Sequence, residues 1–425
     1  MIKFDLTVAG AYLFFITILL QNTVALAFVA TGVAVPVSPF YAVKFLLLFA
    51  VAWLLLVTKT LPRLGSTERT ALLIVLVVLL VTVAKGGGFQ YEAGELEFYF
   101  VPILLFFVGR ATAPFKNDQQ MARLLMTLGI LYVVLGTAYE LIGQEALANG
   151  GLRVLLGERL NAVGRGDSPL INGLPENLWS FLPNGDRISR AFGALFEPLA
   201  SAFFGVTLAF HLWEIHRRRV VAGAGLLAVA VTVLIGLSIC RAVILGMILV
   251  FIASLIHKKG IIALPLWPVL VVSIAGVVLI FANLNTVLPF LDPSSGGHLA
   301  AYMNLNSGNS LISLFGNRFD SGVARGEESL YSTILFECGI VGLGCFVTWF
   351  VQLYFRIRKL IDYPYARAMF ESMIVYIFAS FTTEHWFAVS SCTLFWFLLG
   401  NNLTAIDQQN AGIDHESPAG AKALA

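Results

Sequence analysis

The strongest constraint in this sequence is the repetition of uncharged apolar runs, each about as long as a helix that crosses a bilayer. A helix rises ~1.5 Å per residue, so a hydrocarbon layer ~30 Å thick needs about 20 apolar residues. The first run extends from near Leu6 to near Gly32. This run exceeds the roughly 7–15 apolar residues of a signal-peptide core. We therefore interpret it as a retained first span.

Charged residues are too scarce for a water-facing surface. Only 12% of the 425 residues are charged and 58% are hydrophobic, whereas soluble domains carry roughly 25% charged residues. This composition excludes a soluble enzyme, a disordered chain and a single-pass anchored domain. It also excludes an outer-membrane barrel, whose strands of ~10 residues alternate apolar and polar side chains. Because a helix satisfies its own backbone hydrogen bonds in lipid, the sequence predicts an all-α polytopic membrane protein.

Twelve apolar segments are the candidate spans. They lie near residues 7–31, 41–58, 70–84, 96–109, 124–142, 192–213, 220–237, 241–256, 261–283, 329–355, 368–382 and 388–405. Together they predict a transmembrane domain over residues 1–406. Residues 407–425 are small and polar, which predicts a disordered tail.

The distribution of Lys and Arg predicts which loops face the cytoplasm. With the N-terminus inside, most of the 27 Lys and Arg residues fall on one side, among them the run Arg217–Arg219. By the positive-inside rule, twelve spans then leave both termini in the cytoplasm. Two long segments, near 143–191 and 284–328, lie on the outer side, and loops of this length are usually either functional or disordered. The first contains aromatic and aliphatic residues and is expected to fold.

The remaining composition excludes several classes of function. A net charge of +2 gives no sign of a nucleic-acid partner. The four cysteines lie in or beside apolar spans without metal-ligand spacing, so we interpret them as small buried hydrophobes. No Gly-rich nucleotide loop, zinc signature, nucleophile elbow or Asp-x-Asp pair occurs. We therefore expect neither a metal nor another cofactor.

Arg241 is the first polar candidate, because it lies between two apolar spans on the outer side. An Arg at the bilayer centre costs about 2.5–3.5 kcal/mol on insertion scales. We therefore expect Arg241 at an outer helix end, facing the protein interior or a cavity. The alternative is an interfacial Arg that extends to the lipid headgroups, which is disfavoured because outer loops are poor in cations.

A second group of charges precedes the span that starts near Ser329. Helical spacing would align Arg318, Arg325 and Glu328 on one stripe just above the membrane. The alternative is an ordinary solvated helix entrance, in which the helix dipole favours acidic residues in the first turn. We interpret the stripe as a candidate site.

A third group lies before the middle span. Arg187 and Arg190 are placed above the span, and Glu197 lies one to two turns inside it. Glu337 lies similarly inside a later span and could pair with Arg241 or Arg190. A carboxylate in lipid is costly unless it is paired or faces water. A structural ion pair and a role in the reaction are both open for Glu197 and Glu337.

Several arginines on one face suggest a phosphate ligand. The planar guanidinium binds phosphate through two hydrogen bonds and keeps its charge. Above a bundle of apolar helices, such arginines suit a ligand with a phosphate head and a hydrocarbon tail, such as a lipid-diphosphate-linked sugar. In glycosyl transfer, Arg241 and Arg318 would stabilise the diphosphate leaving group. Glu328 would accept the proton of the attacking hydroxyl.

Three stretches share short motifs with one known family. They are Arg190-Ala-Phe-Gly-Ala-Leu-Phe-Glu-Pro-Leu-Ala200, Leu237-Ser-Ile-Cys-Arg241, and Arg318 through Glu337-Cys-Gly-Ile-Val-Gly342. By these motifs and its spans, the chain resembles the bacterial O-antigen polymerase and O-antigen ligase superfamily, which includes exopolysaccharide repeat-unit polymerases. One departure is that Ile239 and Cys240 separate Ser238 from Arg241, where the family has a Ser-Arg junction.

The resemblance implies a GT-C-like glycosyltransferase of the bacterial inner membrane. Its substrate would be an undecaprenyl-diphosphate-linked oligosaccharide, used on the periplasmic face with inversion at the anomeric carbon and without a metal. The product would be an exopolysaccharide or the O-antigen of lipopolysaccharide. Partners would include a chain-length regulator or other membrane proteins of polysaccharide assembly.

Two alternatives stand beside a repeat-unit polymerase. Ligases of the family carry a His in the outer loop before the late span, where this chain has Glu327, Glu328 and Ser329; this departure favours a polymerase. A flippase for lipid-linked sugars would place ionisable groups near the midplane, often within internal repeats. No repeat is visible, and the charges gather at outer helix ends, which favours an enzyme.

Overall fold

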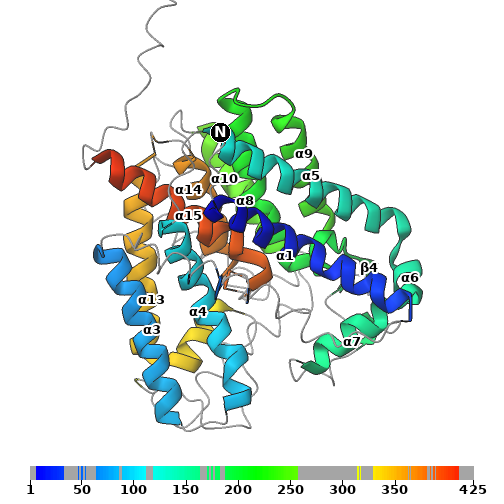
Figure 1. Ribbon diagram of the computed structural model, residues 1–425, viewed down its shortest axis with the longest axis horizontal. Helices are drawn as coiled ribbons and strands as arrows, with labels where there is room; N and C mark the ends of the chain where they lie inside the picture. Colours follow the sequence, from blue (N-terminus) through cyan, green and yellow to red (C-terminus); the bar gives the residue numbers. More distant parts are fainter. Residues whose placement is uncertain are drawn as a thin grey trace, which may run out of the picture.

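The computed structural model describes most of residues 6–32, 64–85, 89–111, 118–162, 170–181, 187–256, 329–380 and 383–410, with isolated positions between them. Within this part of the chain, the fold is a bundle of helices (Figure 1). The helices are α1 (Leu6–Ala30), α3 (Ser66–Lys85), α4 (Phe89–Ala111), α5 (Asp118–Ile142), α6 (Gln144–Leu147), α7 (Arg153–Ala162), α8 (Pro198–Arg217), α9 (Ala224–Leu237), α10 (Arg241–Ile256), α13 (Leu330–Arg358), α14 (Ala366–Ala379) and α15 (Val389–Asn410). The predominantly helical class is confirmed.

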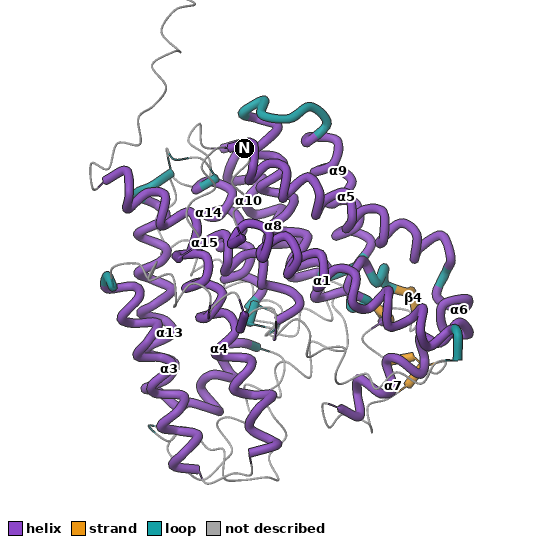
Figure 2. The backbone as a smooth tube through the Cα atoms, in the orientation of Figure 1, coloured by secondary structure: helices purple, strands orange, loops and turns teal. Residues whose placement is uncertain are grey.

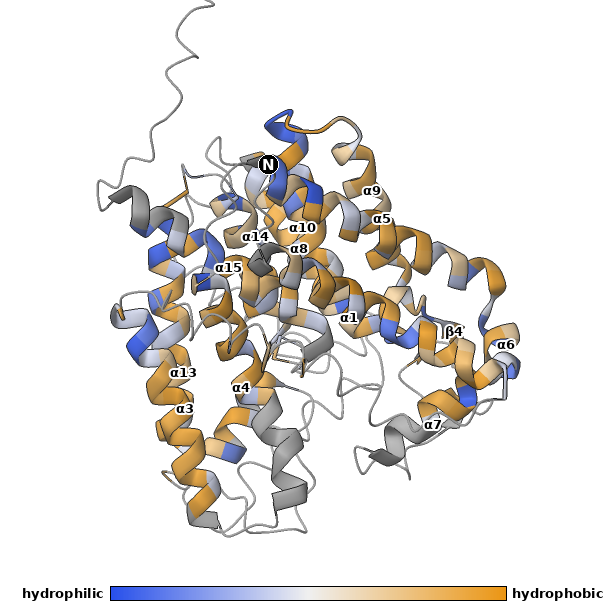
Figure 3. Ribbon diagram, viewed as in Figure 1, coloured by the Kyte–Doolittle hydropathy of each residue, from blue (hydrophilic) through white to orange (hydrophobic). Residues whose placement is uncertain are grey.

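Five of the described helices are long and apolar enough to cross a membrane. Their apolar segments are Ala9–Ala30, Ser66–Val83, Gln119–Ile142, Pro198–Arg217 and Glu337–Arg358. Shorter apolar helices include the segments Phe98–Ala111, Ala224–Leu237 and Arg241–Leu255. Hydrophobic residues extend along most of α3, α5 and α13 (Figure 3). The chain is therefore a helical, membrane-embedded protein.

Each predicted span that the structure describes contains a helix, although several bounds differ. Spans 41–58 and 261–283 and the outer segment 284–328 lie outside the described residues, apart from isolated positions. The helix over 241–256 has the predicted bounds, and α9 ends at Leu237 as expected.

Two boundaries differ from the prediction. The span expected from residue 192 begins as a helix only at Pro198, because Phe196 adopts a left-handed backbone conformation (φ 52°) that an α-helix cannot include. At the other end of the chain, α15 continues through Asn410. Asp407 therefore belongs to the helical bundle and not to the tail that was predicted to start at this residue.

The bundle has two ends that differ in chemistry. The loop end contains the turn Arg217–Arg219 between α8 and α9, together with the start of α14, because Arg218 lies 5.6 Å from the ring centroid of Tyr365. The junction end contains the start of α8 and the break between α9 and α10. Polar residues mark the turn between α8 and α9 in Figure 3.

The entrance to α13 also lies at the junction end. Leu330 N donates to Ser380 O at 3.0 Å, directly after the end of α14. One turn earlier, Tyr376 stacks on Phe203 of α8 at 5.2 Å between ring centroids. The start of α13 and the start of α8 therefore lie at a similar height along the axis of the bundle.

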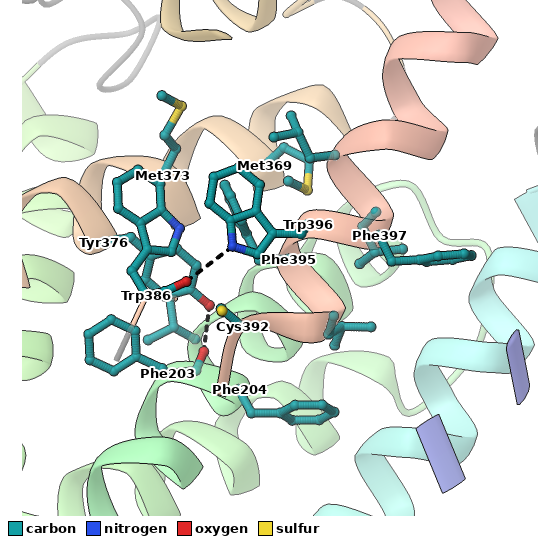
Figure 4. Close-up of a cluster of buried hydrophobic side chains, with 14 of the residues drawn as sticks. Phe203, Phe204, Met369, Met373, Tyr376, Trp386, Cys392, Phe395, Trp396 and Phe397 are labelled. Atoms are coloured by element: carbon teal, nitrogen blue, oxygen red, sulfur yellow. Dashed lines mark hydrogen bonds between the residues drawn. The ribbon is translucent and has the colours of Figure 1, made fainter. Parts of the chain in front are cut away.

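A buried aromatic cluster joins α8, α13, α14 and α15 (Figure 4). Trp349 and Trp396 stack with ring centroids 4.9 Å apart, and Trp386 stacks on Trp396 at 5.5 Å. Trp396 Nε1 donates to Trp386 O at 3.1 Å, and the Tyr376 hydroxyl donates to Phe203 O at 2.5 Å. Each large ring buries much apolar area, so this cluster holds the centre of the bundle rigid.

Two glycines let α4 and α15 cross at close range. A Cβ at Gly109 of α4 would overlap the Phe397 carbonyl oxygen, and one at Gly400 of α15 would overlap the Phe106 carbonyl oxygen. Small residues of this kind allow helix backbones in membranes to approach closely. The close approach brings Thr404 of α15 to Arg110, whose carbonyl oxygen accepts a hydrogen bond from the Thr404 hydroxyl at 2.6 Å.

Near this crossing, four charged residues form a closed network at the loop end. Arg110 binds Glu68 Oε1 at 3.0 Å and Asp407 Oδ2 at 2.6 Å. Arg356 binds the same two oxygens at 2.9 and 2.6 Å. The network joins α3, α4, α13 and α15 and carries no net charge. Because Glu68 is fully buried and Arg110 nearly so, removing one member would leave a buried charge with a lost partner.

The described residues of the long segment 143–191 fold into a cap at the junction end. It contains α6, a π-helical turn, α7 and two short hairpins, in which β1 (Leu170–Ile171) pairs with β2 (Leu174–Pro175) and β3 (Trp179–Phe181) pairs with β4 (Arg187–Ser189). The strands lie beside the far ends of α1 and α5 (Figure 2). Leu152, Leu155, Leu178, Phe192 and Phe196 contribute to a separate small core under the cap.

Candidate functional site

The segment from Arg190 to Glu197 is irregular backbone between β4 and α8. Gly193 has φ +59°, and a Cβ there would overlap the side chain of Ser201. Phe196 has φ 52°, a conformation that a bulky residue rarely adopts. Non-helical backbone at membrane depth is tolerated only where protein or a water-filled cavity surrounds it. This irregular segment is therefore a candidate for function and not an ordinary helix entrance.

Side chains from several helices hold the irregular segment in place. The hydrogen bonds are Asn22 Nδ2 to Leu195 O (2.7 Å), Ser201 Oγ to Phe192 O (2.7 Å), Leu195 N to Ser201 Oγ (3.2 Å), Phe192 N to Glu140 Oε1 (3.3 Å) and Gln144 Nε2 to Arg190 O (3.2 Å). These bonds come from α1, α5, α6 and α8. Because so many elements contribute, the conformation of the segment is determined by the tertiary structure.

The break between α9 and α10 forms the second half of the site. The Ser238 hydroxyl donates to Ile235 O at 2.6 Å and closes the end of α9. Ile239 then adopts φ 50°, which is a genuine outlier for a β-branched residue. After Cys240, α10 begins at Arg241. Left-handed residues of this kind persist only where the surroundings impose them, and they gather at functional sites.

The structure brings these two halves together. Ala191 N donates to Leu237 O at 3.0 Å, which ties the residue after Arg190 to the end of α9. Burial raises the pKa of the Cys240 thiol to about 11, and the nearby Arg190 guanidinium opposes this shift because a cation favours the thiolate. Arg190 is therefore close to the residue that precedes Arg241. Both arginines are half-buried.

The two other predicted residues near this segment have different surroundings. Glu197 is half-buried and precedes the first residue of α8, with an extended backbone. Arg187 belongs to β4, opposite Phe181 in the hairpin. Arg190 and Arg241 are thus the predicted residues that the fold places together.

Glu337 lies in a kinked helix. Gly339 has φ 68° and ψ −168°, a conformation that interrupts α13, and a Cβ at Gly342 would overlap the side chain of Cys338. The predicted Glu-x-Gly-Ile-x-Gly stretch therefore encodes a kink. Glu337 is buried, and the Tyr99 hydroxyl of α4 donates to its Oε2 at 2.5 Å. Pairing of Glu337 with Arg241 or Arg190 stays a prediction.

Arg318, Arg325 and Glu328 lie outside the described residues. Ser329, which follows Glu328 in sequence, is buried, and its hydroxyl donates to Ser380 O at 3.2 Å. This contact lies at the junction end. Ser329 therefore lies at the same end of the bundle as Arg190 and Arg241.

The side chains that hold the irregular segment in place were not among the predicted site residues. Asn22, Glu140 and Gln144 had no motif to mark them. Their common signal is a polar group in or beside an apolar run, as in Gln21-Asn22-Thr23 within α1. In lipid such groups need internal partners, so each was a candidate for a contact that only the fold could identify.

Arg190 and Arg241 are two cations that the fold places close together. Within the described part of the chain, no group of three or more His, Cys, Asp and Glu residues could hold a metal ion. Two arginines beside irregular backbone can instead bind a phosphate or diphosphate through charge-assisted hydrogen bonds. Comparison of the chain with protein-family models, with curated proteins and with solved structures gives no match.

Proposed function

We propose that the chain is a membrane glycosyltransferase that polymerises undecaprenyl-diphosphate-linked oligosaccharide repeat units. Arg190 and Arg241 would bind the diphosphate, and their charges would stabilise the leaving group as the glycosidic bond breaks. Glycan transfer would be inverting and independent of a metal. The product would be an O-antigen or an exopolysaccharide.

The observation that carries the proposal is the hydrogen bond from Ala191 N to Leu237 O, because it joins two of the stretches on which the family resemblance rests. These stretches are far apart in sequence and distinct in structure. Strained backbone at Phe196 and Ile239 lies beside both. A further support is Ser329, which belongs to the third stretch and contacts Ser380 at the junction end.

The finer architecture belongs to the same proposal. Twelve spans in a GT-C-like arrangement would place the junction end on the periplasmic side of the bacterial inner membrane and both termini in the cytoplasm. The basic turn Arg217–Arg219 at the opposite end supports this orientation, because cytoplasmic loops are rich in Lys and Arg. A chain-length regulator or other polysaccharide-assembly proteins would be the partners.

The test uses purified protein in lipid nanodiscs, a synthetic undecaprenyl-diphosphate repeat unit and a chelator. We expect oligomers to grow with the wild-type protein, and we expect Arg241→Ala and Arg318→Ala to abolish growth while both variants still fold. Transfer of the glycan to a lipid A core acceptor would instead identify a ligase. Movement of the lipid across the bilayer without new glycosidic bonds would identify a flippase. Normal oligomer ladders from both variants would contradict the arginine assignment.

A further inference from the structure

We propose that Glu140, in place of the sequence-predicted Glu328, is the general base of this reaction and accepts the proton of the attacking sugar hydroxyl. The inference rests on the proposed function. Glu140 lies in the last turn of α5, which ends at Ile142. It is the one carboxylate in the apolar segment Gln119–Ile142. An ionisable residue at such a position is costly unless it faces water or a partner.

Glu140 contacts the same segment that carries Arg190. Phe192 N donates to Glu140 Oε1 at 3.3 Å, and four residues along the chain Gln144 Nε2 donates to Arg190 O at 3.2 Å. The ring of Tyr139, the preceding residue, lies 4.4 Å from the ring of Phe196. The end of α5 and the start of α6 therefore lie along the irregular segment from Arg190 to Phe196. The Glu140 carboxylate accepts a hydrogen bond from Phe192, two positions after Arg190.

Glu140 differs from the carboxylates that serve the fold. Glu68, Glu214 and Glu371 are buried, and each forms an ion pair with an arginine. The Glu140 side chain is exposed, and among the described residues its one hydrogen bond comes from a backbone amide. A neutral amide oxygen could accept that bond equally well. The negative charge of Glu140 thus has no structural use in the described part of the chain.

Glu337 is a poorer candidate for the base. It is buried in the kinked part of α13, and the short bond from the Tyr99 hydroxyl occupies its Oε2. A base must reach the proton that it abstracts within hydrogen-bond distance. The exposed Glu140 meets this requirement more readily, since a sugar can approach it from outside the bundle.

Two bonds break and two bonds form in the proposed step. The acceptor O–H bond breaks and its proton moves to the Glu140 carboxylate, while the hydroxyl oxygen forms a bond to the anomeric carbon. The bond from that carbon to the diphosphate oxygen breaks, and the electron pair leaves with the diphosphate. In an inverting reaction the base and the leaving group lie on opposite faces of the sugar. The Glu140 carboxylate accepts from Phe192 N, two positions after Arg190, so both groups adjoin the same short segment.

The test compares three variants in the nanodisc elongation assay. Glu140→Gln keeps the acceptor for Phe192 N and removes the base, whereas Glu140→Ala removes both. Glu145→Gln is the matched control, because Glu145 is an exposed carboxylate on the adjacent α6. We expect Glu140→Gln to lower kcat by about 10²–10⁴-fold, the usual contribution of a general base. Glu145→Gln should leave kcat unchanged.

Two further measurements separate a base from a positioning residue. Binding of the lipid-linked repeat unit should be the same for Glu140→Gln and wild type, and the acidic limb of the wild-type pH–rate profile should disappear in this variant. Elongation at the wild-type rate by Glu140→Gln would overturn the inference. So would a loss of donor binding that parallels the loss of elongation. If the wild-type protein fails to elongate, the proposed function itself fails, which is a different result.

Discussion

The two ends of the bundle hold their arginines in different ways. At the loop end, Arg110 and Arg356 each bind both Glu68 and Asp407, and the four residues project from regular helices. At the junction end, Arg190 and Arg241 adjoin left-handed residues in irregular backbone. The first arrangement neutralises charge within the protein. The second holds half-buried cations beside backbone that several elements constrain.

This difference indicates where stability and function lie. A closed network of charges is costly to break but offers little to a ligand, because each charge is already paired with opposite charges within the protein. Strained backbone at Phe196 and Ile239 costs about 1–3 kcal/mol at each residue and persists only because the surroundings impose it. We therefore expect mutations at the loop end to lower stability and mutations at the junction end to lower activity.

The largest expected change in stability comes from Arg110→Ala. The variant leaves Glu68 and Asp407 to share Arg356, so the free energy of unfolding should fall by about 3–5 kcal/mol. Unfolding in detergent micelles, followed by tryptophan fluorescence, measures this change. Elongation per folded molecule should stay at the wild-type level. Arg123→Ala is the control, because Arg123 is exposed on α5; equal stability of the two variants would show that the network is not structural.

A smaller change in stability with a large loss of activity is expected from Gly193→Ala. The new Cβ would overlap Ser201, and the alanine backbone would have to keep φ +59°. The irregular segment should therefore shift, at a cost of about 1–3 kcal/mol. Elongation should be lost, because Arg190 is displaced with the segment. Gly150→Ala is the matched control, since a Cβ at Gly150 has open space around it. Wild-type elongation by Gly193→Ala would contradict a role for this conformation.

The smallest effect is expected from Asn22→Leu. It removes the hydrogen bond from Asn22 Nδ2 to Leu195 O and should lower the free energy of unfolding by about 0.5–1.5 kcal/mol. Elongation should decrease in proportion to the shift of the segment and stay measurable. Thr31→Val at the end of the same helix serves as the comparison, because its hydroxyl bonds only within the helix. A more severe defect in Thr31→Val would show that the Asn22 contact does not position the site.

Much of the helical fold could be predicted from the sequence. Runs of apolar residues define α1, α3, α5, α8, α9, α10 and α13 because only a helix satisfies its own backbone in lipid. The break at Gly236–Arg241 was visible, since a charged residue between two apolar runs is costly within a helix centre. The kink in α13 was less apparent, although Gly339 and Gly342 supply it.

The site could be predicted only in part. Arg190 and Arg241 stood out because each lies beside an apolar run, where a cation is costly. Glu140 did not stand out, because one carboxylate at the end of an apolar run is compatible with a simple interfacial residue. Its contact with Phe192 crosses from α5 to the irregular segment. No local pattern encodes such a contact.

The sequence by itself determined that the chain is helical, that it lies in a membrane and which few charges deserve attention. The length of each apolar run and the scarcity of charged residues are local properties, so they can be recognised from the order of residues along the chain. Only the tertiary structure decided that Arg190 lies beside the α9–α10 junction, that Asp407 belongs to a closed network and that Glu140 adjoins the arginine segment. These relations depend on how antiparallel helices pack, and packing brings together residues whose separation along the chain carries no trace of their contact.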